Sequence, residues 1–378
     1  MTRLFEPLQI GMCSLKHRIV MAPMTRLRAD DEHVPPEMMV EYYSQRASVP
    51  GTLIITESNF IAARSRGRDE NAPGIFTQAQ IDHWRQVTRE VHDRGSFIYV
   101  QLWHVGRAAR KSALEKAGLE MLSSSAIPIS AEHPTPRPMT EEEIQNCIDD
   151  FAQAAENAIE AGFDGVEIHG ANGYLIDQFT QDTCNQRTDK WGGSIENRSR
   201  FCLEIVRAVC DAIGPERTGI RLSPFSTFQG MRMEDPIPQF TYLISKLKTF
   251  GLSYLHLIEP RVSGNVDLHS KTLETDSLDF ARAAWQKCSP IILAGGYTPA
   301  TASQALDTTL KDGDIAIAFG RFFISNPDLP YRAAKNLALT PYQRDTFYKV
   351  KSPNGYIDYG FSEEWLQEKA SNHTGDLK

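Results

Sequence analysis

Eight short apolar segments recur along the chain, and most of them are separated by stretches with helical patterning. Each segment is rich in Ile, Val, Leu or Phe and is nearly continuous rather than alternating, which is typical of strands buried on both faces of a parallel sheet. The segments are RIVMAP from Arg18, TLIITES from Thr52, FIYVQLW from Phe97, GVEIHG from Gly165, GIRLSP from Gly219, YLHLIEP from Tyr254, PIILAGG from Pro290 and IAIAFGR from Ile315.

The stretches between these segments predict amphipathic helices. One helix is expected from Ile81 and ends with Gly95 as its C-cap. A second begins with the capping-box pair Thr140 and Glu143 and ends at Gly162. Further helices are expected to begin at Ser194 and near Pro236, Ser277 and Thr298.

Eight strands with helices between them predict a single (β/α)8 barrel over residues 1–378. An open doubly wound sheet is the alternative, but G-x-G-x-x-G does not follow the first strand. Outside the repeat, Leu8–Arg18 predicts a hairpin that plugs the barrel floor, and Gly106–Pro138 is a long loop after the third strand. We expect the polar residues 365–378 to be a flexible tail.

Composition and charge exclude several classes of partner and site. The net charge of −8 argues against a nucleic-acid partner. The six cysteines are scattered without C-x-x-C spacing, which predicts free thiols and neither a disulfide framework nor a metal site. No apolar run approaches the ~18 residues of a membrane span, and no signal peptide is visible, so we expect a cytoplasmic protein. Monomer and homodimer stay open.

Chemistry in such barrels is carried at the carboxyl ends of the strands. Gly295 and Gly296 follow the seventh segment, and Gly320 and Arg321 follow the eighth. This is the common barrel position for a phosphate, because backbone N–H groups can approach it at glycines and arginine adds a bidentate charge. The alternative is that the glycines only make tight turns.

A second group, H-x-x-N-x-Y, follows the fourth segment as His169, Asn172 and Tyr174. A neutral His and an Asn amide can both donate to one carbonyl oxygen, which stabilises the enolate formed when hydride adds. A Tyr beside them is a candidate proton donor. The same spacing also suits a His and an Asn that only stabilise their own loop.

The segment HGANGYLIDQF, followed by NQRTDKWGGSIENRSRF, resembles the Old Yellow Enzyme family of FMN-dependent ene-reductases. The resemblance continues through APMTRLRA, YYSQRAS, TLIITES, QLWHVGR, RLSP, HLIEPR, AGGY, AFGRFFISNPDLP, DTFY and GYIDY, and so covers essentially the whole chain in order. Its character is fungal, near the branch that includes ergot-alkaloid aldehyde reductases.

The resemblance implies bound FMN that is reduced by NAD(P)H, with NADPH the family's habitual reductant, and then passes hydride to the β carbon of an α,β-unsaturated carbonyl compound. It implies that His169 and Asn172 bind the carbonyl oxygen and that Tyr174 protonates the α carbon. The aromatic walls of the pocket would be Trp103, Phe228 and Tyr348. The residues expected to contact FMN are Pro23, Met24, Thr25, Ser58, Gln101, His169, Arg221, Gly295, Gly296, Gly320 and Arg321.

Other functions compete with this one. A flavin-dependent double-bond isomerase would use the same scaffold without net NAD(P)H consumption, although Tyr174 argues against it because some relatives that isomerise carry Phe there. A flavin-binding sensor without turnover is a third hypothesis. A metal-dependent hydrolase is a fourth, with Glu167, His169 and His256 as imagined ligands, but no further cluster completes such a site.

Overall fold

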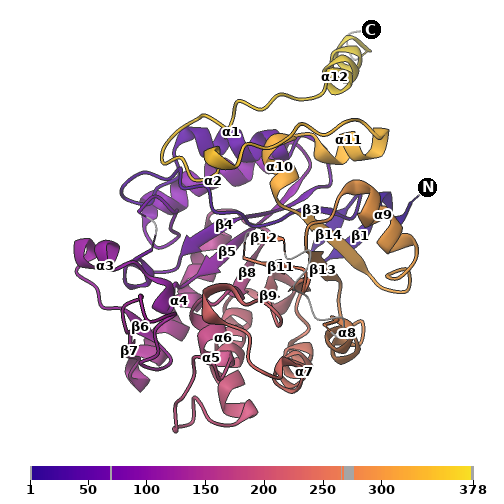
Figure 1. The fold of residues 1–378 in the computed structure, drawn as a ribbon. Helices are drawn as coiled ribbons and strands as arrows, with labels where there is room; N and C mark the ends of the chain where they lie inside the picture. Colours follow the sequence, from indigo (N-terminus) through magenta and orange to yellow (C-terminus); the bar gives the residue numbers. More distant parts are fainter. Residues whose placement is uncertain (1, 69, 265, 268–275, 376–378) are drawn as a thin grey trace.

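Eight parallel strands close into a barrel in the computed structural model, which describes residues 2–68, 70–264, 266–267 and 276–375. Each strand pairs with its neighbours along the chain, and the last strand pairs with the first (Figure 1). All eight coincide with the predicted apolar segments, so the (β/α)8 prediction is confirmed. The strands are β3 (Ile19–Met21), β4 (Leu53–Phe60), β5 (Phe97–Trp103), β8 (Gly165–Gly170), β9 (Thr218–Leu222), β10 (Tyr254–Ile258), β13 (Ile291–Ala294) and β14 (Ile315–Phe319).

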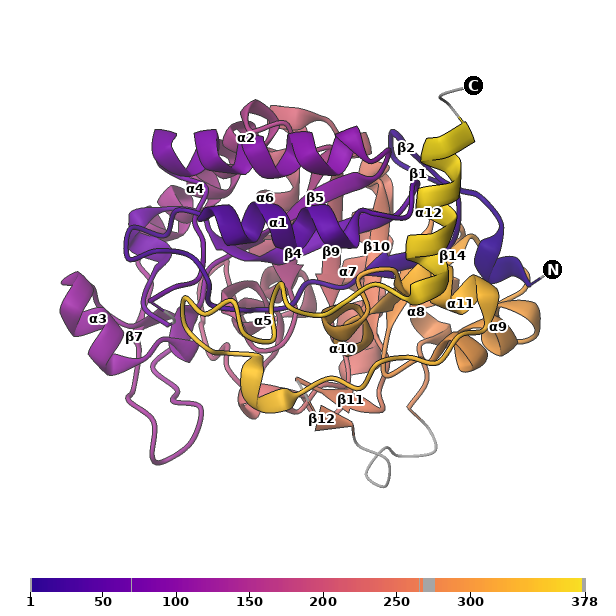
Figure 2. The ribbon, with the colours of Figure 1, turned by 90° about the horizontal axis from the view of Figure 1, so that it is seen from above.

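Most helices surround the barrel and bury their apolar faces against the outside of the strands, whereas α3 and α12 stand away from it (Figures 1 and 2). The helices are α1 (Glu37–Arg46), α2 (Gln78–Asp93), α3 (Lys111–Ala117), α4 (Glu141–Glu160), α5 (Leu175–Thr180), α6 (Ile195–Ile213), α7 (Pro236–Leu247), α8 (Asp279–Trp285), α9 (Pro299–Asp307), α10 (Arg321–Ser325), α11 (Leu329–Lys335) and α12 (Glu363–Gly375). Short 3-10 turns are η1 (Arg3–Phe5), η2 (Ala63–Ser65), η3 (Gly106–Ala108), η4 (Pro215–Arg217), η5 (Phe228–Gly230), η6 (Lys248–Phe250) and η7 (Arg344–Thr346).

Side chains that accept backbone hydrogen bonds set the starts of the long helices. The capping box of Thr140 and Glu143 begins α4 as predicted. Helix α2 begins before the expected Ile81, because Thr77 and Gln80 form a second capping box ahead of the first apolar position. The predicted Gly95 follows the end of α2 with φ +70°, a conformation that glycine adopts without strain.

The predicted hairpin at the floor of the barrel is present as β1 (Leu8–Ile10) and β2 (Cys13–Leu15). Its side chains alternate between buried and exposed, as a strand with one face on the core requires. The buried ones form one cluster with inward-facing barrel residues such as Tyr99 and Tyr254. The hairpin therefore closes one end of the barrel and leaves the other end for ligands.

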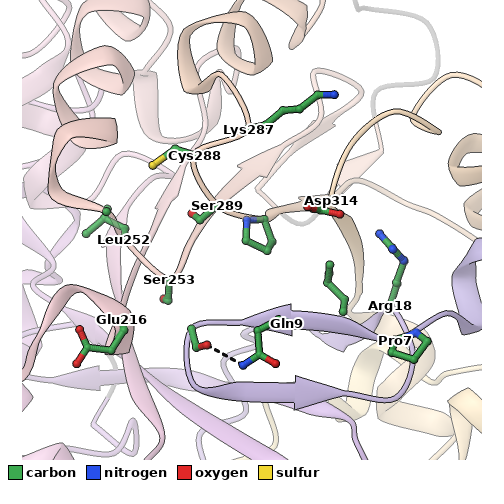
Figure 3. Close-up of a pocket in the computed structure, with 14 residues that line it drawn as sticks. Pro7, Gln9, Arg18, Glu216, Leu252, Ser253, Lys287, Cys288, Ser289 and Asp314 are labelled. Carbon is green, nitrogen blue, oxygen red and sulfur yellow. Dashed lines mark hydrogen bonds between the residues drawn. The ribbon is translucent and has the colours of Figure 1, made fainter.

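A polar cavity of about 480 Å³ lies beside this hairpin, at the floor of the barrel. Figure 3 shows Arg18 and Asp314 on one side of it and Glu216 on another, so opposite charges share its lining. None of the strand-end residues predicted to bind cofactor or substrate contributes to this cavity. In barrels of this kind the floor serves stability and the opposite end serves function.

The functional end of the barrel is covered by two excursions. The predicted loop after the third strand contains η3, α3 and a small two-stranded sheet of β6 (Leu122–Ser123) and β7 (Arg137–Pro138). After β10, the antiparallel strands β11 (Val262–Ser263) and β12 (Val266–Asp267) lie at the opposite end of the barrel from β1 and β2 (Figure 2). In the loop near Val262–Lys271, to which the family resemblance assigns part of the substrate specificity, residues 265 and 268–271 lie outside the described residues.

The described part of the predicted tail over residues 365–378 is helical, since α12 runs from Glu363 to Gly375. The helix is anchored because Trp365 is buried and its ring lies 5.0 Å from the ring of Tyr331. Ser362, just before the helix, donates its backbone N–H to buried Asp328 at 2.9 Å. Among the described residues, no helix is long and apolar enough to cross a membrane.

Candidate active site

The inside of the barrel differs in chemistry between its two halves. Strands β13 and β14 contribute small apolar side chains, among them Ala294 and Ala318, and Ala22 follows the end of β3. Strands β4 to β10 contribute polar side chains instead, namely Ser58, Gln101, Glu167, His169, Arg221 and His256. An interior that is polar on one side and lined by alanine on the other suits a flat ligand with one polar edge.

His169 is a neutral hydrogen-bond donor at the end of β8. The Ala171 N–H donates to its Nδ1 at 3.3 Å, so a neutral ring carries its proton on Nε2. Burial and the positive charge of Arg221 lower the pKa of His169 to about 3. The ring therefore stays uncharged near neutral pH and can donate through Nε2.

Asn172 and Gly173 form a tight loop with φ of 58° and 72°, both in the left-handed region. The Asn172 N–H donates to Ser223 Oγ and the Gly173 N–H donates to Asp177 Oδ2, each at 2.8 Å. A Cβ on Gly173 would lie 2.8 Å from Met231 Cγ, so only glycine fits. The buried Asn172 Oδ1 has no hydrogen-bond partner among the described residues, as expected of an amide that faces a ligand.

Tyr174 follows this loop as the N-cap of α5. Its ring lies edge-on to the rings of His169 and Trp103, with both centroid distances 4.9 Å. The Arg68 guanidinium lies 5.5 Å from the centroid of the same ring. The structure thus brings His169, Asn172 and Tyr174 into one group, as the sequence predicted.

Trp103 packs against Tyr174 and helps to hold its ring in place. Its exposed fraction is 1 %, and its ring stacks on Phe60 at 5.2 Å. Phe228 is half-buried and packs against Gly264, where an added Cβ would lie 2.4 Å from its ring. Tyr348 is 49 % exposed. Contact of these three aromatic side chains with a ligand stays a prediction.

Gln178 was not singled out from the sequence, yet it ties the substrate loop to the excursion after β5. Its Nε2 donates to the carbonyls of Gly173 at 2.8 Å and Val105 at 3.2 Å. Its Oε1 accepts from the Arg107 N–H and from Ser123 Oγ, both at 3.0 Å. The motif contained the residue, but the partners are far apart in the chain and became visible only in the fold.

A β-bulge decides which side chain of β4 enters the barrel. The pairing with β5 shifts between Ile55 and Ser58, so that Ser58 stands opposite Gln101. Without this extra residue, Glu57 would face inward. Ser58 Oγ instead donates to Gln101 Oε1, and Gln101 Nε2 donates to Glu167 Oε1 at 2.7 Å.

Arg221 is half-buried on β9, in register with His169 on one side and His256 on the other. Burial lowers the pKa of Arg221, and the negative charge of Glu167 opposes this shift. Its Nε is buried without a hydrogen-bond partner among the described residues. A guanidinium with an unused buried donor indicates a place for an electron-rich ligand.

The segment after β3 contains the half-buried residues Pro23, Met24 and Thr25. The next residue, Arg26, holds this segment in place. The Arg26 N–H donates to Glu57 Oε2 at 3.0 Å, and its guanidinium donates to the Phe347 carbonyl at 3.1 Å. These bonds bring the segment that carries Tyr348 to the same end of the barrel.

The predicted phosphate loops differ in what their glycines require. A Cβ on Gly295 would lie 2.4 Å from Glu259 Cβ, and Gly296 has φ +66°, so both have a structural reason. At Gly320 the nearest atom to an added Cβ would be Met24 Sδ at 3.4 Å, which is ordinary contact. Packing therefore does not explain Gly320, and close approach of a ligand beside Arg321 would.

Comparisons with known proteins agree with this geometry. The model of the NADH:flavin oxidoreductase / NADH oxidase family matches residues 3–340. The chain is similar to Old Yellow Enzyme from Pichia sp., with a TM-score of 0.88 and 39 % identity over 96 % of this chain and 94 % of that one. The chain belongs to the Old Yellow Enzyme family.

Fungal members of the Old Yellow Enzyme family are among its relatives. It is 56 % identical to the chanoclavine-I aldehyde reductase fgaOx3 of Penicillium roqueforti, over 97 % of this chain and 98 % of the relative. It is 53 % identical to the NADP-dependent oxidoreductase lnbE of Aspergillus flavus, over 96 % and 97 %. It is also 50 % identical to the probable inactive reductase easA of Epichloe festucae var. lolii, over 97 % of each chain.

This Old Yellow Enzyme family member is a flavin oxidoreductase with FMN as its cofactor. The residues present fit FMN, because Arg221 offers an unused buried donor, the facing strands carry small alanine side chains, and no packing clash explains the glycine at position 320, next to Arg321. Among the described residues, no group of three or more His, Cys, Asp or Glu side chains could hold a metal ion, which gives the hydrolase alternative no support. Instead, Glu167 accepts hydrogen bonds from His256 and Gln101.

Proposed function

We propose that the protein is an NADPH-dependent ene-reductase for α,β-unsaturated carbonyl compounds. When bound, FMN accepts hydride from NADPH and supplies hydride to the β carbon of the substrate. The protein contributes the carbonyl-binding donors, the α-carbon proton and a pocket that holds the substrate alkene. The observation that carries the proposal is the group formed by His169, Asn172 and Tyr174.

Two donors are available for the substrate carbonyl oxygen. His169 is neutral with its proton on Nε2, and the Asn172 amide is held in place by a strained backbone. Donors fixed before the reaction stabilise the negative charge that grows on this oxygen as hydride adds to the β carbon. A neutral His suits this role, since it donates without trapping the enolate as a stable ion pair.

Tyr174 is the proposed proton donor to the α carbon. Its ring is confined by His169, Trp103 and Arg68, so its hydroxyl is held near the carbonyl-binding pair. With hydride added at the β carbon and a proton at the α carbon, the C=C bond becomes saturated and the carbonyl is regenerated. Retention of this hydroxyl favours net reduction over isomerisation.

The names of two relatives support an aldehyde among the substrates. Chanoclavine-I aldehyde reductase of P. roqueforti and the aldehyde reductase FrzD of Cladobotryum sp. are 56 % and 48 % identical to this chain. NADPH as reductant is supported by the NADP-dependent relative lnbE. We therefore propose a small enal or enone as substrate.

The test separates the two half-reactions under anaerobic conditions, with NADPH added first and then 2-cyclohexenone or cinnamaldehyde. Flavin absorbance should bleach with NADPH and return with the unsaturated compound, giving saturated product. Tyr174→Phe should leave bleaching nearly unchanged and slow the return by about 10²–10⁴-fold, the usual contribution of a general acid. The matched control Tyr331→Phe removes a hydroxyl bonded to Glu368 on α12 and should change neither step.

The outcomes discriminate among the candidate functions. If Tyr174→Phe slows flavin reduction by NADPH as much as reoxidation by the unsaturated compound, Tyr174 is not the proton donor. A shifted double bond in the product, with no net NADPH consumed, would replace reduction by isomerisation. Bleaching by NADPH with no return for any enal or enone would contradict the proposed substrate class.

A further inference from the structure

A buried carboxylate lies beneath the proposed flavin site and takes no part in the proposed chemistry. Glu167 stands on β8 two residues before His169, so both side chains face the barrel interior. The carboxylate is fully buried and accepts three hydrogen bonds. The donors are Gln101 Nε2 at 2.7 Å, His256 Nδ1 at 2.7 Å and Tyr254 Oη at 3.1 Å.

An ionised carboxylate accepts hydrogen bonds but cannot donate, and this property orients its partners. The Gln101 amide must turn Nε2 toward Glu167, which leaves Oε1 to accept from Ser58 Oγ. The His256 ring must carry a proton on Nδ1. One group thus sets the orientation of a predicted flavin contact and the tautomer of a neighbouring ring.

The negative charge of Glu167 also stabilises the positive charge of the Arg221 guanidinium. Burial by itself would raise the pKa of Glu167, but the hydrogen bonds from His256 and Gln101 and the positive charge of Arg221 keep this pKa below its usual value. Arg221 and Glu167 lie on neighbouring strands, on the same inner face of the barrel. A bound ligand therefore experiences the positive charge of Arg221 partly cancelled by the negative charge of Glu167.

We propose that Glu167 is a positioning residue that orients the Gln101 amide and acts as the internal counter-charge of Arg221, and thereby sets the affinity and reduction potential of FMN. The inference rests on the proposed placement of FMN beside Gln101 and Arg221. Reduction adds negative charge to a flavin, so a fixed anion nearby disfavours the reduced form and a fixed cation favours it. Glu167 keeps the effect of Arg221 below its full strength.

The test is Glu167→Gln, which keeps the shape and removes the charge. FMN affinity is measured by fluorescence titration of the apoprotein, and the midpoint potential by equilibration with a reference dye. Preference for reduced over oxidised FMN should rise on the order of tenfold, the scale expected when one buried charge is removed at an effective dielectric constant of about 20. For a two-electron couple, tenfold corresponds to about 30 mV in the positive direction. FMN binding should weaken, because a glutamine amide has one acceptor oxygen and cannot accept from Gln101, His256 and Tyr254 together.

The matched control is Asp328→Asn, which neutralises another fully buried carboxylate, paired with Arg332 at 2.7 Å on α11 outside the barrel. It should lower stability without moving the potential. A Glu167→Gln protein with wild-type affinity and potential would overturn the proposal. If that variant gives no folded protein, Glu167→Asp takes its place, since it keeps the charge at shorter reach. Weaker FMN binding at a wild-type potential supports the proposal, and unchanged binding overturns it.

Both readouts are obtained without substrate, so failure of this inference is distinct from failure of the proposed function. A wild-type protein that binds FMN but reduces no enal or enone would leave the role of Glu167 standing. A wild-type protein that takes up no FMN would instead remove the site on which both proposals rest.

Discussion

Replacing Gln178 by leucine should separate the geometry of the substrate loop from global stability. Gln178 is fully buried and makes four hydrogen bonds, to Gly173, Val105, Arg107 and Ser123. A buried hydrogen bond contributes about 1 kcal/mol net, so the variant should lose about 4 kcal/mol of unfolding free energy. The loop that carries Asn172 and Tyr174 would also lose its tie to the excursion after β5.

The expected kinetic effect follows from the lost tie. Misplacement of a reacting group by about 1 Å can cost on the order of 10²-fold in rate. We therefore expect reoxidation of the flavin by 2-cyclohexenone to slow by about that factor in Gln178→Leu. Thermal unfolding followed by circular dichroism gives the stability change, and anaerobic stopped-flow absorbance gives the rate.

Gln239→Leu is the matched control. Gln239 is also fully buried, and it makes three hydrogen bonds, to Arg198, Ile195 and Ser199, between α6 and α7. Its loss should cost about 3 kcal/mol of unfolding free energy and leave the reoxidation rate within about twofold. If the two variants slow reoxidation equally, Gln178 acts through stability alone and the reasoning about the loop is refuted.

Two further predictions concern stability. Gly173→Ala should lower the unfolding free energy by about 2–5 kcal/mol through strain and overpacking, whereas Gly251→Ala, at the same φ of 72° but with open space around it, should cost only about 1–2 kcal/mol. Equal thermal shifts would contradict the clash. His17 is buried, and burial lowers its pKa from 6.5 to about 4, so its protonation opposes folding. The unfolding free energy that depends on neutral His17 is fully present above pH 6.5. It is lost as pH falls toward 4, and about 2 kcal/mol is already lost at pH 5. His17→Asn should flatten the pH dependence of unfolding in this window, and an unchanged slope in urea titrations would contradict the assignment.

The local sequence determined the elements of this protein. Strands buried on both faces need continuous apolar side chains, so all eight could be placed from the pattern alone. The start of α4 was equally readable, since a capping box is a contact between residues three apart. The cluster of His169, Asn172 and Tyr174 was visible for the same reason, because these residues lie within six positions of one another at the end of one strand.

Tertiary structure decided which of the polar side chains meet, because those meetings join residues far apart in the chain. The bulge in β4 brings Ser58 rather than Glu57 to Gln101, and pattern alone does not reveal an extra residue in a ladder. The bonds of Glu167 to Tyr254 and His256 span more than eighty residues and form inside the closed barrel, across β9, the strand that lies between β8 and β10. The packing of the C-terminal helix was not readable from its polar composition, because Trp365 on α12 meets Tyr331, which is contributed by another helix. Local chemistry thus follows from the sequence, whereas the environment that tunes it follows from the closure of the barrel.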